Sequence, residues 1–475
     1  MANACGALQS GGFASIDNRV FPMLHLSIKT DKKGVVNMAE RRDLINAEGH
    51  LMFGGCDTVM LAKTYGTPLY VVDGAMVEEK MLECRQAMAQ CFDSYKVFYA
   101  SKALCAKAIY KLAEKNGLHL DVVSAGELKM ALESGMPGER IALHGNVKLY
   151  PELSMAAENG CTVNIDSIEE IEDVQAVAAE KGTVVPVLVR VTPGVEAHTH
   201  AYIQTGIEDC KFALGIENGM AMEAIRRILA CKNLSFRGIH GHIGSQILES
   251  EPYYPTGKNL AAFALKVESE TGAKVQEINL GGGFGIRYTK EDHPLPILSY
   301  LEKAKQGLWE AYKAAGKPLP TIGIEPGRCI VGEAGLMLYT VALRKEIPGV
   351  RTYVSVDGGM ADNLRVSLYQ AEYEGVLANR MNEENEETVR IAGRCCESGD
   401  ILISEIALPR AKKGDTLAMF ATGAYCYAMA SNYNKLPIAP MVMVKNGAHG
   451  LMVHGQSLED MTRFDTVPEF LGEEK

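Results

Sequence analysis

Short hydrophobic runs alternate with longer stretches that carry apolar residues at helical spacing through the middle of the chain. The β-rich runs lie at residues 97–100, 120–124, 141–144, 162–165, 185–191, 236–242, 275–280 and 321–325. Helical patterns occupy residues 76–92, 103–115, 126–133, 151–158 and 168–181. Such alternation requires parallel strands joined by crossover helices, and eight such units closing on themselves form a TIM barrel. We therefore predict an α/β protein with a (β/α)8 barrel over residues 76–330.

The pattern changes after residue 325 to strands without long helices. These runs lie at 335–343, 353–357, 388–392, 400–403, 416–420 and 441–444, and they predict a second, mostly β domain over residues 331–475. An earlier buried strand begins at Leu69 and ends at Asp73, and we expect the segment 46–75 to join the second domain. Residues 1–45 show no sustained period. We predict that they form a poorly ordered N-terminal extension, with Met38 as a candidate start of the patterned chain.

Composition and charge place the chain among ordinary folded proteins. It has 475 residues, of which 47% are hydrophobic and 23% charged, close to average globular usage. Its 48 basic and 59 acidic residues give a net charge of −11, without a long block of like charges. Nucleic acid and anionic membrane surfaces are therefore poor candidate partners.

Cysteine usage and hydropathy indicate a cytoplasmic protein. The 12 cysteines are too sparse for a disulfide scaffold, and none form a Cys-x-x-Cys pair typical of redox or zinc sites. The longest uncharged run, between Asp415 and Lys435, is too polar to span a bilayer. The first 45 residues lack the basic-then-apolar order of a signal peptide.

Polar residues follow the predicted barrel strands, and the ends of barrel strands are where active sites lie. These residues are Ser101-Lys102, His144-Gly145-Asn146, His240 to Gln246, Gly281-Gly282-Gly283 and Glu325-Pro326-Gly327-Arg328. We expect an amine, imidazoles, a glycine turn and a Glu/Arg pair to converge on one mouth of the barrel.

Each of these groups has a structural and a chemical interpretation. A lysine after a strand is commonly a solvated charge, but at a barrel mouth Lys102 can lose its proton by desolvation and act as a nucleophile. The triple glycine at 281–283 is either a tight turn or a phosphate cradle with three available N–H groups. It does not complete a dinucleotide fingerprint, because Ile286 and Tyr288 stand where a last glycine is needed.

His240 and His242 lie on one face of a strand, a spacing that also opens the metal sites of barrel hydrolases. No further cluster is apparent to complete the ligand set, and we predict no metal. Glu325 and Arg328 are either a surface ion pair of little energetic value or a partner for a pyridinium nitrogen and a phosphate clamp. Lysine, cradle, stacking imidazole and carboxylate together describe a site for pyridoxal 5′-phosphate (PLP).

From about Gly49 to its end, the sequence resembles the diaminopimelate decarboxylase family. The motifs that carry the resemblance are Tyr99-Ala-Ser-Lys102-Ala, Leu120-Asp-Val-Val-Ser, His144-Gly-Asn, Thr192-Pro-Gly-Val-Glu-Ala-His-Thr-His200, His242-Ile-Gly-Ser-Gln, Leu280-Gly-Gly-Gly-Phe-Gly, Glu325-Pro-Gly-Arg, Val356-Asp-Gly-Gly-Met, Cys396-Glu-Ser-Gly-Asp and Thr422-Gly-Ala-Tyr425. The resemblance implies a fold-type III, alanine racemase-like homodimer with shared active sites. It also implies decarboxylation of meso-2,6-diaminopimelate to L-lysine, the last step of lysine biosynthesis.

The resemblance further implies a role for each matching residue. Lys102 would carry PLP covalently and His242 would stack on its ring. The phosphate and the pyridinium would be held by Ser245, Gly283, Glu325, Pro326, Gly327 and Arg328. The substrate carboxylates would bind Arg328, Arg365 and Tyr369, and Tyr425 would touch both cofactor and substrate. Cys396 and Glu397 would come from the other subunit.

Cys396 is the expected proton donor to the carbon that loses its carboxylate, since a thiol pKa near 8.5 can be moved by neighbours. The structural interpretation of Cys396 is a buried small hydrophobe. Glu397, with Arg residues, suits the far amino-acid group of the substrate. The chain departs from the family pattern at Val147, Cys395 and Val366, and Cys395 is the competing candidate for the donor.

Three alternatives remain open from the sequence. The first is a decarboxylase of the same fold acting on another amino acid, such as a D-amino acid or carboxynorspermidine. The second is a regulatory pseudo-enzyme that keeps the barrel without catalysis, against which Lys102, Cys396 and Arg365 argue together. The third is a metal hydrolase, which would bind zinc and show no absorbance from a bound aldehyde cofactor.

Overall fold

The computed structural model describes residues 45–195 and 210–472. Residues 1–44 of the predicted extension, including Met38, lie outside the described residues. So do positions 196–200 of the motif that begins at Thr192.

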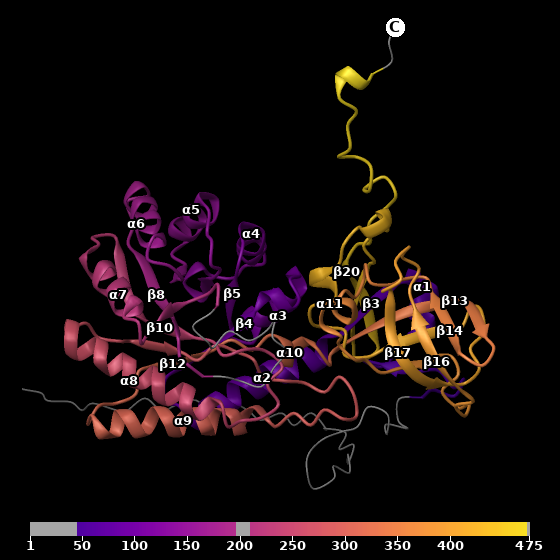
Figure 1. Cartoon of the computed structure of the whole chain (residues 1–475), viewed down its shortest axis with the longest axis horizontal. Helices are drawn as coiled ribbons and strands as arrows, with labels where there is room; N and C mark the ends of the chain where they lie inside the picture. Colours follow the sequence, from indigo (N-terminus) through magenta and orange to yellow (C-terminus); the bar gives the residue numbers. More distant parts are fainter. Residues whose placement is uncertain (1–44, 196–209, 473–475) are drawn as a thin grey trace, which may run out of the picture. The chain divides into compact units, whose positions relative to one another are not determined.

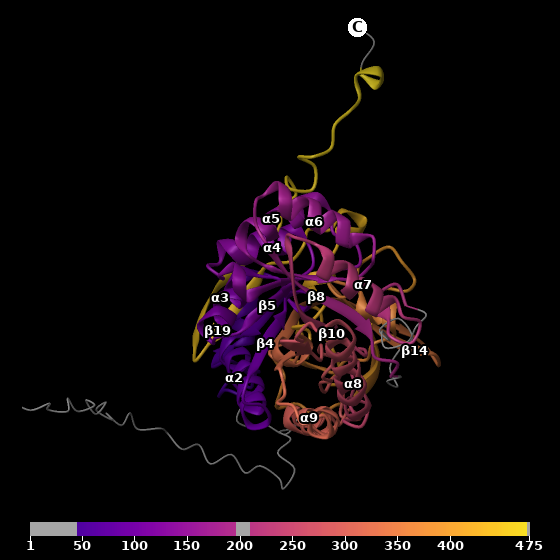
Figure 2. The same ribbon diagram turned by 90° about the vertical axis from the view of Figure 1, so that its left-hand side faces the viewer.

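Eight parallel strands of the described residues close into a barrel (Figures 1 and 2). They are β4 (Tyr95–Ala100), β5 (His119–Val122), β6 (Ile141–Leu143), β7 (Thr162–Ile165), β8 (Val185–Thr192), β10 (Leu234–Gly241), β11 (Glu277–Asn279) and β12 (Thr321–Ile324). Closure comes from two pairings, β12 with β4 and β10 with β8. A short strand, β9 (Leu214–Gly215), extends the sheet beside the end of β8.

Helices surround the barrel strands, as Figure 2 shows. They are α2 (Gly74–Cys91), α3 (Lys107–Lys115), α4 (Ala125–Glu133), α5 (Tyr150–Asn159), α6 (Glu170–Glu180), α7 (Met220–Ala230), α8 (Tyr253–Thr271) and α9 (Ile297–Ala314). Helix α2 begins where the Asp73 carboxylate accepts the N–H groups of Ala75 and Met76. Its buried residues include Val77, Met81, Cys84 and Met88, whose spacing of three and four places them on one face.

A second sheet is built mostly from the later part of the chain. Its main path contains β3 (Leu69–Asp73), β13 (Gly335–Ile347), β14 (Arg351–Val356), β16 (Glu387–Ala392), β17 (Ile401–Leu408), β19 (Met441–Lys445) and β20 (Ala448–Val453), with β15 (Gly375–Leu377) and β18 (Thr416–Met419) beside it. Strand β3 lies between β13, to which it is antiparallel, and β19, to which it is parallel. All of β3 is buried, so a strand from the start of the described chain lies inside this sheet.

The fold class predicted from the pattern, a TIM barrel with a mostly β domain, is confirmed. The helix expected over 103–115 begins only at Lys107, because Ser101–Ala103 forms a separate 3₁₀ turn after β4. Strands β15 and β20 were not predicted. The first has three residues, and the second opens with exposed Ala, His and Gly residues that carry little strand signal.

The described chain also contains three short helices and a pair of short strands. They are α1 (Thr58–Tyr65), α10 (Arg328–Val331), α11 (Arg365–Tyr369), and the pair β1 (Met52–Phe53) and β2 (Cys56–Asp57). None of the helices in the described chain has the length and apolar character needed to cross a membrane.

Candidate active site

A cavity of about 770 Å³ lies at the carboxyl ends of the barrel strands and is also lined by residues of the second domain. The predicted site residues that line it are Lys102, His242, Ser245, Gly283, Glu325, Gly327, Arg328, Arg365, Tyr369 and Tyr425. The cavity therefore brings together most of the polar groups that follow the strands, as expected for a barrel mouth. Three predicted residues do not line it: Pro326, Cys396 and Glu397.

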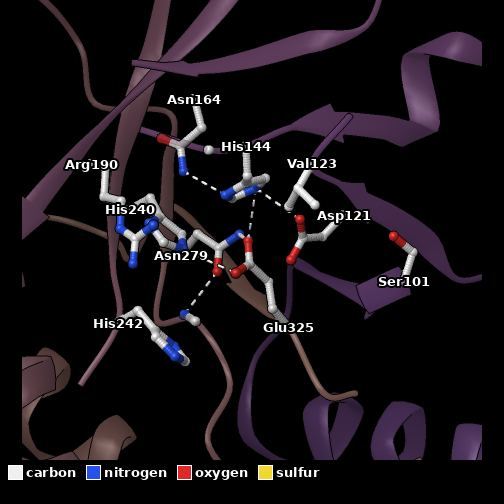
Figure 3. Close-up of polar contacts among 12 residues, drawn as sticks. Ser101, Asp121, Val123, His144, Asn164, Arg190, His240, His242, Asn279 and Glu325 are labelled. Carbon is white, nitrogen blue, oxygen red and sulfur yellow. Dashed lines mark hydrogen bonds and ion pairs between the residues drawn. The ribbon is translucent and has the colours of Figure 1, made fainter. Parts of the chain in front are cut away.

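Glu325 is the centre of a buried polar cluster at the floor of the cavity (Figure 3). Its Oε1 accepts a hydrogen bond from Asn279 Nδ2 at 2.8 Å and lies 3.2 Å from His144 Nε2. Its Oε2 lies 3.0 Å from His240 Nε2. Burial alone would raise the pKa of the Glu325 carboxyl, but His240 and His144 outweigh burial and hold that pKa well below its usual range. Glu325 is therefore ionised.

The pKa values of the two imidazoles beside Glu325 shift in opposite directions. Burial would lower the pKa of His144, but Asp121 and Glu325 outweigh it and raise the pKa. The pKa of His240 is lowered, mainly by burial. The side-chain amide of Asn164 lies beside His144, with Nδ2 2.9 Å from His144 Nδ1. Asn164 Oδ1 has no hydrogen-bond partner in the described chain, so the opposite orientation of the amide would let this oxygen accept the Nδ1 proton of a charged His144. Of the two rings, His144 is therefore the one whose charged form the site favours.

The residues that could bind a metal in the structure differ from the pair that the sequence suggested. Ligand atoms of His144, His240 and Glu325 lie within 4.8 Å of one another, so the expectation that no further cluster accompanies His240 is wrong. His242, the other half of the proposed pair, is not part of this group. The three groups contact one another through the atoms that would otherwise bind a metal.

Lys102 follows β4 in the 3₁₀ turn and projects into the cavity, where its side chain is accessible. Burial by the cavity walls would lower the pKa of its ammonium group. The negative charges of Asp121 and Glu325, with Tyr425, outweigh this effect, and the pKa is raised above its ordinary value. The expectation that desolvation removes the proton of Lys102 is therefore wrong, because the barrel supplies carboxylates that favour the charged form.

His242 presents a neutral ring to the cavity. Its pKa lies well below the usual value, mainly because of burial and then because of the positive charges of Lys102 and Arg190. Its Nδ1 accepts the Gly282 N–H at 3.2 Å. A neutral, flat ring beside the amine suits a position against an aromatic cofactor.

The triple glycine offers fewer free N–H groups than expected. Gly281 N–H donates to Asn279 Oδ1 at 2.9 Å and Gly282 N–H to His242, so the expectation of three available donors is wrong for two of them. Gly283 N–H has no acceptor among the described residues. Gly283 has φ +103°, and a Cβ there would lie 2.5 Å from the Gly244 carbonyl oxygen, so only glycine fits.

Two guanidinium groups are buried in the cavity wall. Arg328 Nη2 donates to Ser245 Oγ at 2.8 Å, and its guanidinium lies 4.8 Å from the Tyr425 ring centre. Arg365 Nη1 donates to Tyr373 Oη at 2.5 Å. Each arginine is only 6% exposed, and within 45–195 and 210–472 neither forms an ion pair with a carboxylate. Buried unpaired charge is costly, so these cations fit a site for an anionic ligand.

Pro326 acts through the backbone, because its carbonyl oxygen accepts the Ala100 N–H at 3.1 Å and joins the ends of β12 and β4. Cys396 and Glu397 are exposed and lie outside their own chain's cavity. Cys395 is buried, and burial raises the pKa of its thiol to about 11. A thiol that holds its proton so tightly is a poor acid at neutral pH.

Several groups of the site were missed from the sequence. They are Asp121, Asn164, Arg190, Asn279, Tyr288 and Tyr373. Asp121, Asn164, Arg190 and Asn279 are polar residues within predicted barrel strands, and a polar residue in a hydrophobic strand of a closed barrel is a signal that could have found them. Tyr288 and Tyr373 lie in irregular segments and carry no such signal.

Comparisons with known proteins agree with this geometry. Residues 75–332 match the family described as "Pyridoxal-dependent decarboxylase, pyridoxal binding domain". A diaminopimelate decarboxylase of Bacillus subtilis (strain 168) is 47% identical over 422 residues, covering 88% of this chain and 96% of the relative. One from Staphylococcus aureus (strain COL) is 44% identical over 424 residues, covering 89% and 99%.

Solved structures give the same result. The crystal structure of diaminopimelate decarboxylase from M. jannaschii is 33% identical with a TM-score of 0.84, covering 90% of this chain and 98% of that one. The Helicobacter pylori enzyme complexed with L-lysine is 29% identical with a TM-score of 0.77, covering 86% and 98%. The barrel, its lysine and glutamate, and these likenesses over most of the chain show that it belongs to the diaminopimelate decarboxylases, a family of PLP-dependent carboxy-lyases.

Proposed function

We propose that this chain removes one carboxylate of meso-2,6-diaminopimelate as CO2 and releases L-lysine, the last step of lysine biosynthesis, with PLP in the cavity. The observation that carries the proposal is the pair Arg328 and Arg365, buried without acidic partners in the cavity that holds Lys102. A substrate with an amino-acid group at each end supplies two carboxylates for such fixed cations. Ornithine and lysine have no distal carboxylate and would leave one arginine unpaired.

The cavity fits PLP in three respects. Lys102 supplies an amine, and ionised Glu325 supplies a negative charge for the ring nitrogen. Arg328 Nε is buried and has no hydrogen-bond partner in the described chain, so it is a free donor for a phosphate or carboxylate oxygen. We propose that PLP is held by Lys102, His242, Ser245, Gly283, Glu325, Pro326, Gly327, Arg328 and Tyr425. When bound, PLP supplies a cationic ring that accepts the electron pair left when CO2 departs.

The protein's own groups set the protons of the site. Glu325 stays ionised, and it would hold a proton at the ring nitrogen of a bound PLP. His242 stays neutral, so it would pack against the ring of a bound PLP without adding positive charge. Lys102 must release a proton before its amine can bond to the cofactor carbonyl, because its pKa is raised in the unliganded site.

Arg328, Arg365 and Tyr369 are the proposed contacts for the substrate carboxylates, with Tyr425 touching both ligands. Tyr373 and Tyr288 bond to the guanidinium groups and fix their planes. A fixed fork binds a carboxylate through two parallel hydrogen bonds, which orients the carboxylate as well as attracting it. The site can therefore distinguish the two ends of the substrate.

The proton donor is proposed to come from a second copy of the chain. Cys396 and Glu397 are exposed and do not line the cavity of their own chain. In a homodimer, Cys396 would give a proton to the carbon that lost its carboxylate, and Glu397 would accept a hydrogen bond from the distal ammonium. We also propose a cytoplasmic location, which the free thiols of the described cysteines support.

The reaction is tested by incubating the purified protein and PLP separately with meso-diaminopimelate, D-lysine, carboxynorspermidine, L-lysine and L-ornithine. We expect CO2 and L-lysine in equal amounts from meso-diaminopimelate alone. Lys102→Ala should lose both this activity and the borohydride-sensitive absorbance of bound PLP. Faster turnover of any other substrate, or a PLP adduct that survives at another residue, would contradict the proposal.

The shared site is tested by mixing two inactive variants, Lys102→Ala and Cys396→Ala. Cys396→Ala alone should keep the cofactor absorbance while kcat falls by about 10²–10⁴-fold, the contribution of a positioned acid. Random exchange makes half of the dimers mixed, and each mixed dimer has one intact site, so about a quarter of wild-type activity should return. Cys395→Ala is the matched control and should retain most activity. No recovery after proven subunit exchange would show that each site is built from one chain.

A further inference from the structure

The C-terminal arm, residues 457–472, has a packed base around Met461, which is 9% exposed, and its far end extends away from the rest of the described chain in both views (Figures 1 and 2). Its large apolar side chains are almost bare: Leu458 is 76% exposed, Phe464 81%, Val467 74%, Phe470 84% and Leu471 65%. Single exposed apolar residues are common on protein surfaces. Five within one short segment, two of them phenylalanines, are typical of a surface that another molecule covers.

The base of the arm is tied to the loop that carries Cys396. Cys396 N–H donates to Asn434 Oδ1 at 2.7 Å. The next residue, Lys435, donates from Nζ to the Met461 carbonyl oxygen at 3.0 Å and pairs with Asp465 at 2.9 Å. Asn434 and Lys435 have φ of 54° and 55°, an uncommon left-handed backbone for residues with side chains. One turn thus connects the arm with the proposed proton-donor loop.

We propose that the C-terminal arm packs its apolar side chains on the second copy of this chain, the copy that receives Cys396, and so strengthens the dimer. This inference rests on the proposed function, because Cys396 acts only when a partner covers the surface around it. The base of the arm is bound to the same surface by hydrogen bonds with the Asn434–Lys435 turn. A partner that closes over Cys396 is therefore the nearest body on which the arm can bury its phenylalanines.

The charge of the arm disfavours a membrane as the occupant. The arm carries four acidic residues, Glu459, Asp460, Asp465 and Glu469, and one basic residue, Arg463. Anionic lipid surfaces attract basic segments and repel acidic ones. The whole chain is also acidic, with a net charge of −11. A second copy of the chain is thus the better match for this apolar surface.

The experiment compares Phe464→Ser/Phe470→Ser with a matched control, Val184→Ser/Leu229→Ser. The control side chains are also exposed, at 53% and 42%, and Val184 precedes β8 at the barrel end opposite the cavity. For PLP-loaded protein we would measure the dimer dissociation constant by sedimentation and the specific activity over a dilution series. The arm variant should raise the dissociation constant at least tenfold and lose activity on dilution, while the control follows wild type.

At concentrations that restore the dimer, kcat and the cofactor absorbance of the arm variant should return to wild-type values. An unchanged dissociation constant and dilution profile would overturn the arm proposal and leave the shared site standing. Recovery of activity in the Lys102→Ala and Cys396→Ala mixture tests that site separately. A wild-type protein that is monomeric and fully active would overturn both proposals.

Discussion

The two sides of the cavity differ in how complete they are within one chain. On the barrel side, Glu325 already contacts Asn279, His144 and His240. On the side of the second domain, Arg365 is buried with a tyrosine and no carboxylate, and Cys396 lies on the outer surface. The barrel side is preorganised by internal bonds, whereas the other side requires a substrate and, by our proposal, a partner.

This difference separates two tasks. A group that sets the charge of a cofactor should be rigid before the cofactor arrives, because a preorganised charge needs no rearrangement during the reaction. Groups that bind substrate must exchange it at each turnover, so permanent internal partners would compete with the ligand. Changes to the Glu325 cluster should therefore alter the cofactor and kcat, and changes to the substrate-binding arginine on the other side should alter mainly KM.

The largest effect is expected at the barrel side, for Glu325→Gln. A neutral amide cannot hold a proton at the ring nitrogen, and it also removes one of the two carboxylates that raise the pKa of His144. We expect kcat to fall by about 10²–10³-fold, the scale for removing one preorganised electrostatic group. The absorbance of bound PLP should shift with pH in the variant but not in wild type. A kcat within a few-fold of wild type would end the assignment of Glu325.

An intermediate effect is expected at the second domain, for Arg365→Met. Loss of a charge-assisted hydrogen bond costs about 1.5–3 kcal/mol, so KM for meso-diaminopimelate should rise about 10–150-fold. The PLP absorbance should be unchanged, because Arg365 is proposed to touch substrate only. Arg344→Met, which removes an arginine paired with Glu387 on the same domain, is the control and should leave KM unaltered. A fall in kcat alone would place Arg365 with the cofactor groups.

The third expected effect changes stability and leaves the kinetics of the site unaltered, and it concerns Asp362 near the Cys396 loop. Burial, then Asp357 and Asp400, raises the pKa of Asp362 from 3.8 to about 7. Between these values the folded state keeps a proton that the unfolded state has lost, so stability falls as pH rises from about 4 to about 7. Asp362→Asn removes the titration and can still accept the Gly359 N–H.

The free energy of unfolding of the wild type should therefore fall between pH 5 and pH 8. We expect this fall to be about 2–3 kcal/mol smaller in Asp362→Asn. Urea unfolding at both pH values, at a fixed protein concentration, measures this difference. Asp173→Asn, on the exposed face of α6, should behave like wild type. A wild-type-like drop in Asp362→Asn would remove Asp362 from the pH dependence.

The barrel could be predicted because its strands are short hydrophobic runs between helical patterns, and this signal is local. The same local signal placed Lys102, His242, Glu325 and Arg328 at strand ends, and the closed barrel brings them to one cavity. Strand β20 and the start of α3 were missed because exposed Ala, His and Gly residues and a 3₁₀ turn have no clear periodicity.

Other features of the site depend on neighbours that are distant in sequence. The raised pKa of Lys102 comes from Asp121 and Glu325, which only the barrel brings near the amine. Only one N–H of the triple glycine stays available, that of Gly283, because Asn279 and His242 accept the N–H groups of the other two glycines. Such properties belong to the assembled geometry, so no residue pattern could have given them.

The position of β3 between β13 and β19 has a consequence for synthesis of the protein. The ribosome releases the central strand of the second sheet before the whole barrel, and the flanking β19 emerges only near the end of translation. Until then the unpaired edges of β3 are a template for wrong pairing. Nascent chains that stall after the barrel should therefore depend on chaperones, and a chain truncated before β19 should be less soluble than the full chain.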